Sequence, residues 1–185
     1  MPEFFEFFER PQGGSDFVRL KDGDRRSLRI ISKPVQGWEI FLDGKPRRWR
    51  PDENIPTDVT IPEGENVRQF AAFIVCEYDE QKPIGAVKIW SVTQKSILSD
   101  MQNLFGNGRH WTDFELVLTR RGEGLRTTYS LSGVERAIEP ELLQIASETE
   151  KFIDLDKLYS GENPFVTQPP HVVKAETANP SGMPF

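Results

Sequence analysis

Hydrophobic and polar residues alternate along much of the chain, and this period of two predicts β-strands. Strands are expected in SLRIIS (27–32) and, as two short strands around a DGK turn, in GWEIFLDGKPRRW (37–49). The runs FAAFIVCEYD (70–79) and IGAVKIWSVT (84–93) predict a hairpin through the EQKP between them. A second hairpin is expected around the loop TRRGEGLRTTYS (119–130), between HWTDFELVL and YSLSG.

Three other segments have the spacing of amphipathic helices. QKSILSDMQNLFGNG (94–108) predicts one helix closed by a glycine, and residues 139–161 predict one long helix or two that meet near Asp154. PEFFEFFER (2–10) places its phenylalanines on one face and its charged residues on the other. This aromatic helix either packs on its own domain or forms an arm that docks onto a second copy of the chain.

The order of these elements is a bent first strand region, a hairpin, a helix and a second hairpin. It predicts a mainly β fold: a five-stranded OB-fold barrel with its helix between strands three and four, plus peripheral N- and C-terminal helices. The expected segments are an aromatic arm (1–12), the OB-fold domain (17–135), a C-terminal helical segment (136–161) and a tail (162–185). The tail is rich in proline and has almost no periodicity, so it is expected to be disordered.

The cysteine and histidine content limits the chemistry that the chain can support. Cys76 is the only cysteine, which excludes an intramolecular disulfide, and His110 and His171 do not have metal-ligand spacing. We therefore expect no metal and no cofactor. The acidic N-terminus is unlike a secretory signal, and no apolar run approaches the roughly 18–20 residues of a membrane helix. These features predict a cytoplasmic protein without membrane contact.

Charge is distributed unevenly along a chain whose formal net charge is −6. Residues 17–50 contain ten Lys and Arg against four Asp and Glu, a balance of +6, whereas residues 134–185 contain four against nine, a balance of −5. Binding to phosphate follows the local potential, so the basic stretch can contact nucleic acid despite the negative total. The acidic end can compete with that contact.

No catalytic motif is present in the sequence. It lacks a nucleophile elbow, a phosphate loop of the GxxxxGK type and an HExxH pair. Asp113 and Glu115 fall on one face of a predicted strand, but two carboxylates without a base or a metal do not specify a site. We therefore expect the protein not to be an enzyme.

The segment GKPRRWRP (44–51) combines cations with a flat side chain, as binding of single-stranded nucleic acid requires. In a strand, alternation sends Arg47 and Trp49 to one face and Arg48 and Arg50 to the other. One of the two pairs can therefore face the exterior of the barrel in either register.

The strand GAVKIWSV (85–92) offers a second combination of this kind. Lys88 and Trp90 point away from Val87 and Ile89, as a stacking platform with a phosphate contact would require. The alternative is that Trp90 packs beneath the loop 51–68 and Lys88 is solvated.

The loop of the last hairpin carries Arg120, Arg121 and Arg126, with Gly122 and Gly124 permitting a tight reversal. In an OB fold, the loop between strands four and five borders the oligonucleotide groove. The three arginines would then bind the nucleic-acid backbone along one side of that groove. Because bases of any sequence stack on aromatic rings, binding would have little sequence preference.

Residues 70–132 resemble the OB core of single-stranded DNA-binding proteins encoded by tailed bacteriophages. In that family a strand with a lysine-hydrophobic-tryptophan pattern leads to a helix, a strand and a hairpin rich in arginine and glycine. The residues that carry the resemblance are Lys88, Trp90, Trp111, Arg121, Gly122, Gly124, Thr128 and Tyr129. The resemblance implies protection of replication or recombination intermediates in the cytoplasm of an infected bacterium, and it adds Trp111 to the candidate nucleic-acid contacts.

The last residues, Met183, Pro184 and Phe185, are similar to the Pro-Phe tip with which bacterial single-stranded DNA-binding proteins recruit replication and repair partners. Those tips follow a run of aspartates, whereas this chain has Glu176 and no such run. The resemblance implies a partner with an apolar pocket for the terminal phenylalanine and basic residues for its carboxylate.

Three classes of function are consistent with these patterns. The first is single-stranded DNA binding with little sequence specificity. The second is an OB-fold adaptor of a replisome or virion that binds protein or RNA and does not bind single-stranded DNA. The third is an enzyme with an unrecognised site, for example a magnesium-dependent nuclease that uses Asp113 and Glu115. Tryptophan fluorescence quenched by oligo(dT), with an affinity that falls as salt rises, is expected only for the first.

Overall fold

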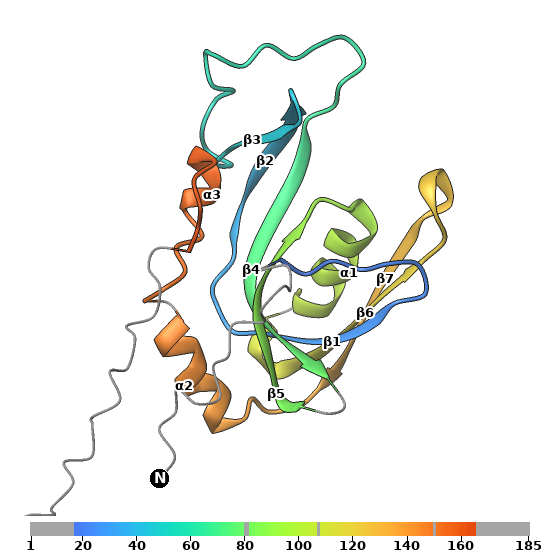
Figure 1. The fold of residues 1–185 in the computed structure, drawn as a ribbon, viewed down its shortest axis with the longest axis vertical. Helices are drawn as coiled ribbons and strands as arrows, with labels where there is room; N and C mark the ends of the chain where they lie inside the picture. The colour runs from blue at the N-terminus through green and yellow to red at the C-terminus, as the bar shows by residue number, and fades with distance from the viewer. Residues whose placement is uncertain (1–16, 80–81, 107, 150, 166–185) are drawn as a thin grey trace, which may run out of the picture.

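The structure, a computed structural model, is built around an antiparallel sheet (Figure 1). It describes residues 17–79, 82–106, 108–149 and 151–165. The predicted aromatic arm (1–12) lies outside the described residues, as does the end of the predicted tail with Met183, Pro184 and Phe185.

Seven strands form one sheet in the order β3-β2-β4-β1-β6-β7, and β5 pairs with β4. The strands are β1 (Arg25–Ile30), β2 (Val35–Leu42), β3 (Lys45–Trp49), β4 (Arg68–Asp79), β5 (Lys82–Val92), β6 (Phe114–Arg121) and β7 (Thr128–Glu135). Each hairpin predicted from the alternation is present. The turn between β2 and β3 consists of Asp43 and Gly44, with φ of 49° and 77°. The mainly β fold is thus confirmed.

β1 and β2 together run along the length of β4. β1 pairs with the second half of β4, from Ser27 opposite Tyr78 to Ile30 opposite Val75, and β2 pairs with the first half. Residues 31–34 interrupt the ladder between the two strands. This is the bent first strand region that the sequence predicted.

The sheet is not closed into the predicted five-stranded barrel. Within the described residues no pairing joins β5 to β7. The edge of β5 pairs with the N-terminal segment instead, where the amide of Val18 donates to the carbonyl of Ile89 at 2.8 Å. Residues 17–24, dark blue in Figure 1, then cross to β6, where the amide of Gly23 donates to the carbonyl of Arg120 at 3.1 Å. This segment links the edge of β5 to β6 and does not join β5 to the edge strand β7.

Helices and turns complete the described fold. α1 (Lys95–Phe105) lies between β5 and β6 in the chain, as predicted, and ends at Gly106, whose amide donates to the carbonyl of Gln102 at 2.8 Å. The C-terminal segment forms α2 (Pro140–Thr149) and α3 (Lys157–Ser160), so the alternative with two helices is confirmed. Two 3-10 turns are η2 (Trp111–Asp113) and η3 (Gly124–Arg126). Among the described residues, no helix has the length and apolar character needed to cross a membrane.

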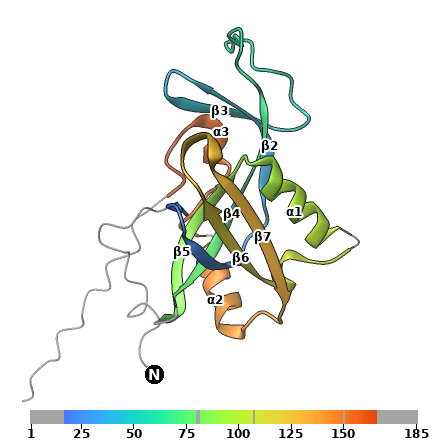
Figure 2. The same cartoon turned by 90° about the vertical axis from the view of Figure 1, so that its right-hand side faces the viewer.

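Apolar side chains pack on both faces of β4. The inner cluster lies on the side of α1, and the outer cluster lies on the side of α2 and α3 (Figure 1). Figure 2 shows β6 and β7 crossing β4 and β5. The inner cluster includes Leu28, Ile30, Phe73, Val75, Trp90, Ile97, Met101, Phe114, Leu116 and Leu118. The outer cluster includes Ala72, Ile74, Cys76, Ile89, Leu142, Ile145, Ile153, Leu155 and Leu158.

A buried arginine joins β1 to the linker that precedes α2. The side chain of Arg29 is 1% exposed, and its Nη1 donates to the carbonyl of Arg136 at 2.8 Å while Nη2 donates to the carbonyl of Ala137. Glu139 places a carboxylate oxygen 3.5 Å from Nη2. A buried charge requires such partners, and here they attach the C-terminal segment to the sheet.

Candidate nucleic-acid interface

A hollow of about 320 Å³ lies between the ends of β5 and β7, next to residues 18–20. Trp90 and Tyr129 contribute to its lining from the two strands, and Arg19 and Arg120 bring positive charge. Aromatic rings stack on bases, and guanidinium groups bind phosphates. The hollow therefore combines the two kinds of group that single-stranded nucleic acid requires.

The guanidinium of Arg120 is held at this hollow without an acidic partner among the described residues. Its Nη1 donates to the carbonyl of Leu20, and its Cζ lies 5.9 Å from the centroid of the Tyr129 ring. Its Nε is buried and has no hydrogen-bond partner within the same described parts of the chain. An unmet buried donor is costly, so the protein does not satisfy the whole hydrogen-bonding capacity of this guanidinium.

The loop between β6 and β7 is ordered by hydrogen bonds. The amide of Gly122 donates to Oδ1 of Asp22 at 2.6 Å, and Oγ1 of Thr127 donates to the carbonyl of Gly122 at 3.3 Å. Gly122 and Gly124 have φ of 83° and 54°, in the left-handed region that favours glycine. The prediction that these glycines permit the tight reversal is confirmed.

Replacing Gly122 with alanine is expected to lower the free energy of unfolding by about 2 kcal/mol. A positive φ raises the conformational free energy of a residue with a Cβ by roughly 1–2 kcal/mol. A Cβ at Gly122 would also lie 2.4 Å from the carbonyl oxygen of Arg126. Gly124→Ala is the matched control, because a Cβ there meets nothing within 4 Å. Urea unfolding measures both variants. Equal losses for the two would show that the contact with Arg126 adds no strain.

Four exposed arginines surround the loop and the hollow. Arg121 and Arg126 belong to the loop, Arg25 lies opposite Thr119 in the pairing of β1 with β6, and Arg19 lines the hollow. We call Arg19, Arg25, Arg121 and Arg126 the basic rim. In the described ranges none of the four forms an ion pair, so their charge is available to a ligand.

The neighbouring aspartates of the N-terminal segment have other partners. Asp22 accepts from the loop amide, and Asp24 accepts from the amide of Lys21 at 2.9 Å and binds Arg26 at 3.3 Å. The hydrogen bond from Lys21, followed by the charge of Arg26, holds the pKa of Asp24 below its usual value. Asp22 and Glu123 keep their negative charges, but Arg120 and the four arginines of the basic rim outnumber them, so the balance around the rim stays positive.

Two arginines of β3 that were predicted to bind phosphate have carboxylate partners instead. Arg48 is largely buried, with Nε 2.8 Å and Nη2 2.7 Å from Oε2 of Glu39. Arg47 forms an ion pair with Asp58 of the long loop that follows β3. The sequence prediction counted these cations without the acids that the fold brings to them.

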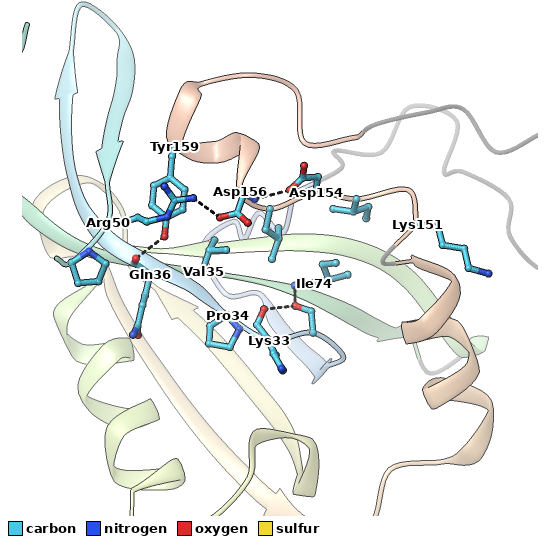
Figure 3. Close-up of a pocket in the computed structure, with 14 residues that line it drawn as sticks. Lys33, Pro34, Val35, Gln36, Arg50, Ile74, Lys151, Asp154, Asp156 and Tyr159 are labelled. Atoms are coloured by element: carbon cyan, nitrogen blue, oxygen red, sulfur yellow. Dashed lines mark hydrogen bonds and ion pairs between the residues drawn. The ribbon is translucent and has the colours of Figure 1, made fainter. Parts of the chain in front are cut away.

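Arg50, the third of these arginines, lines a larger hollow of about 720 Å³ between β2 and the C-terminal segment (Figure 3). Its Cζ lies 4.7 Å from the centroid of the Tyr159 ring, and it binds Asp156 at 3.1 Å and Glu53 at 3.4 Å. The hydrogen bonds to Glu53 and Asp156 raise the pKa of Arg50. Tyr159 donates to the carbonyl of Gln36 at 2.7 Å, and burial raises its pKa. These contacts attach α3 to the sheet and neutralise the arginine.

Two tryptophans that were predicted to stack on bases are buried. Trp49 is 3% exposed and Trp90 is 4% exposed, and Trp90 packs against Phe73 with ring centroids 5.9 Å apart. Lys88 binds Glu77 at 2.7 Å. Alternation correctly placed Lys88 and Trp90 on one face of β5, but that face belongs to the inner cluster. The prediction of an exposed stacking platform on β5 is therefore wrong, and only the margin of Trp90 reaches the hollow.

Trp111 is not brought together with the basic rim. It is half-buried in η2, where its ring centroid lies 4.1 Å from that of His110. η2 precedes β6, whereas the arginine loop follows the other end of that strand. The two therefore lie at opposite ends of β6.

The prediction that Asp113 and Glu115 lie on one face of the same strand is wrong. Asp113 belongs to η2, where its carboxylate accepts from the amide of His110 at 3.3 Å, and Glu115 in β6 binds Arg136 at 2.8 Å. Over the described residues, no group of three or more His, Cys, Asp or Glu side chains is placed to hold a metal ion.

The outer face of β4 and β5 is filled by protein. In OB folds the face of strands two and three takes part in oligonucleotide binding, but here Leu142 and Ile145 of α2, with Leu158 of α3, bury that face in the outer cluster. The hollow and the basic rim at the β6–β7 loop thus combine aromatic rings with several exposed arginines that form no ion pair among the described residues.

Sequence reasoning missed Arg19 and Arg25 as candidate contacts and noted Tyr129 only through the family resemblance. The signal for the two arginines was the positive balance of residues 17–50. Their position next to the loop depends on the crossing of residues 17–24 from β5 to β6, which no local pattern indicates.

No protein-family model, curated protein or solved structure matches the chain. The function is therefore inferred from the geometry of the interface.

Proposed function

We propose that this protein binds single-stranded DNA with little sequence specificity at the hollow and the basic rim. The observation that carries the proposal is the gathering of arginines without acidic partners among the described residues, Arg120 and the basic rim, around a hollow lined by Trp90 and Tyr129. Phosphates bind the guanidinium groups, and a base that enters the hollow stacks on Tyr129. Neither contact reads the edge of a base, so sequence preference is weak.

The order of the strands supports an OB-type arrangement. With β1 and β2 taken as one bent strand, the pairing order is β7-β6-β1/β2-β4-β5, and α1 lies between β5 and β6 in the chain. A five-stranded OB fold has the same helix position, and its loop between strands four and five borders the oligonucleotide groove. The β6–β7 loop corresponds to that loop. We therefore propose an open OB-type fold extended by β3, similar to that of the single-stranded DNA-binding proteins of tailed bacteriophages.

In this proposal the protein protects single strands during replication or recombination in the cytoplasm of an infected bacterium, and it acts by binding rather than by catalysis. Recruitment of partners through Met183, Pro184 and Phe185 stays a prediction from the sequence. The same holds for self-association through the aromatic arm.

Replacing Arg121 or Arg126 with alanine is expected to weaken oligo(dT) binding roughly fivefold at 0.1 M salt. Each variant removes one phosphate contact, so the slope of log affinity against log salt should become shallower by about 0.7. Fluorescence anisotropy of a labelled oligo(dT) and of a duplex of equal length, each titrated at several salt concentrations, measures both quantities. The wild-type protein is expected to prefer the single strand.

Arg47→Ala is the matched control, because Arg47 is an exposed arginine whose charge is already paired with Asp58. It is expected to leave both the affinity and the salt slope unchanged. If Arg47→Ala and Arg121→Ala had equal effects, the interface would not be centred on the β6–β7 loop. Absence of oligo(dT) binding by the wild-type protein at low salt would refute the proposed function and favour the adaptor class.

A further inference from the structure

Leu125 is fully exposed at the tip of the β6–β7 loop. A single exposed leucine on a loose loop would need no explanation, but this loop is fixed. Gly124, Leu125 and Arg126 form the turn η3, in which the amide of Arg126 donates to the carbonyl of Glu123 at 3.1 Å. The hydrogen bond from Gly122 to Asp22 holds the base of the loop. An apolar side chain is thus presented to solvent at a defined position.

The neighbours of Leu125 indicate what kind of partner it would contact. Arg126 follows it in the turn and Arg121 precedes the turn at the end of β6, and neither forms an ion pair within the described residues, while Glu123 is the one carboxylate of the loop. A protein-docking surface would require a contiguous apolar patch of several hundred Å². The other large exposed apolar residues in the described ranges lie on different elements, namely Phe41, Ile55, Ile61, Val134 and Leu143. An isolated leucine between two cations does not form such a patch.

An apolar side chain flanked by cations suits the end of a DNA duplex. Proteins that unstack base pairs insert apolar side chains such as leucine between bases, while nearby arginines bind the phosphates of the two strands. At the junction of a single strand with a duplex, the last base pair exposes one apolar face on which such a side chain can insert. The basic rim provides a cation before the leucine and another after it along the loop, Arg121 and Arg126.

We propose that Leu125 is a wedge that separates the first base pair at a junction between single-stranded and double-stranded DNA. This inference rests on the proposed function, because the single-stranded arm must be bound at the hollow and the basic rim. Preferential binding of a single strand already favours open duplex ends by mass action, and the wedge adds to it a direct contact of Leu125 with the first base pair.

The test uses the full-length protein and a forked DNA with a single-stranded oligo(dT) arm. 2-Aminopurine, whose fluorescence rises when it is unstacked, is placed in the first base pair beside the arm or, in a second substrate, in the middle of the duplex. The wild-type protein is expected to raise the signal at the first pair only. Leu125→Ser should reduce that rise about fivefold while changing oligo(dT) affinity less than about twofold, and Leu125→Met should retain it.

Leu143→Ser is the control, because Leu143 is also an exposed leucine but lies on α2. It should behave as the wild-type protein. The wedge is refuted if Leu125→Ser raises the fluorescence as much as the wild-type protein does. It is also refuted if the variant loses oligo(dT) affinity by the same factor as it loses fluorescence rise, because Leu125 would then be part of the single-strand contact. If the wild-type protein does not bind oligo(dT), the proposed function fails, and the wedge fails with it.

Discussion

Replacing Trp90 with alanine is expected to lower the free energy of unfolding by about 3–5 kcal/mol. The side chain is 4% exposed in the inner cluster and packs against Phe73, so its removal leaves a cavity in the core. A loss of this size is a large part of the roughly 5–15 kcal/mol by which a domain of this kind is stable. Urea unfolding followed by circular dichroism measures it without depending on tryptophan fluorescence.

Trp90→Phe is the control for this experiment, because it keeps an aromatic ring in the cluster and should lose clearly less stability than the alanine variant. The alternative view, in which Trp90 is an exposed surface for stacking, makes the opposite prediction. A Trp90→Ala variant with wild-type stability and weakened oligo(dT) binding would therefore contradict the burial of this residue.

Replacing Arg29 with methionine is expected to cost about 3 kcal/mol of unfolding free energy. Methionine fills a similar volume but donates no hydrogen bond. The carbonyls of Arg136 and Ala137 would therefore each lose the hydrogen bond that they accept from the charged guanidinium. Hydrogen bonds to charged groups contribute roughly 1.5–3 kcal/mol each, and unsatisfied buried carbonyls carry a further penalty. Urea unfolding of the full chain is again the measurement.

Glu139→Gln separates the role of the carbonyls from that of the ion pair. The Glu139 side chain is 35% exposed, so the loss of its charge should cost less than about 1 kcal/mol. If this variant lost as much stability as Arg29→Met, the ion pair rather than the linker carbonyls would hold the C-terminal segment. A stable Arg29→Met protein would mean that methionine packing compensates for both hydrogen bonds, as happens at some buried ion pairs.

The strands and helices could be predicted because their signals are local. The alternation in residues 70–79 and 84–93, the helical spacing of 94–105 and the Asp-Gly turn of residues 43–44 each depend on neighbours in the sequence. For residues 139–161 the sequence left open whether they form one helix or two. The five-stranded barrel was predicted from the order of elements. The order does not determine which edges pair, and Phe17 and Val18 pair with the edge of β5.

The candidate site was harder to predict because it depends on contacts between distant segments. A period of two gives a strand two faces but does not say which face is exposed, and in β5 both are covered. Arg50 meets Asp156, more than a hundred residues away, and this cancels a charge that appeared available. The arginine loop was identified correctly as a tight, arginine-rich reversal because its charges and glycines are adjacent in sequence. Whether it binds DNA stays a prediction.

The outer cluster also has a consequence for the redox behaviour of the molecule. Cys76 is the only cysteine of the chain, and it is fully buried in that cluster under the C-terminal helical segment. A chain shortened after β7 would retain every strand and α1, yet it would bare an apolar sheet face with a thiol on it. Such a fragment could associate through that face and then form disulfides between copies. In the full chain the apolar residues of α2 and α3 complete the cluster in which this thiol is buried.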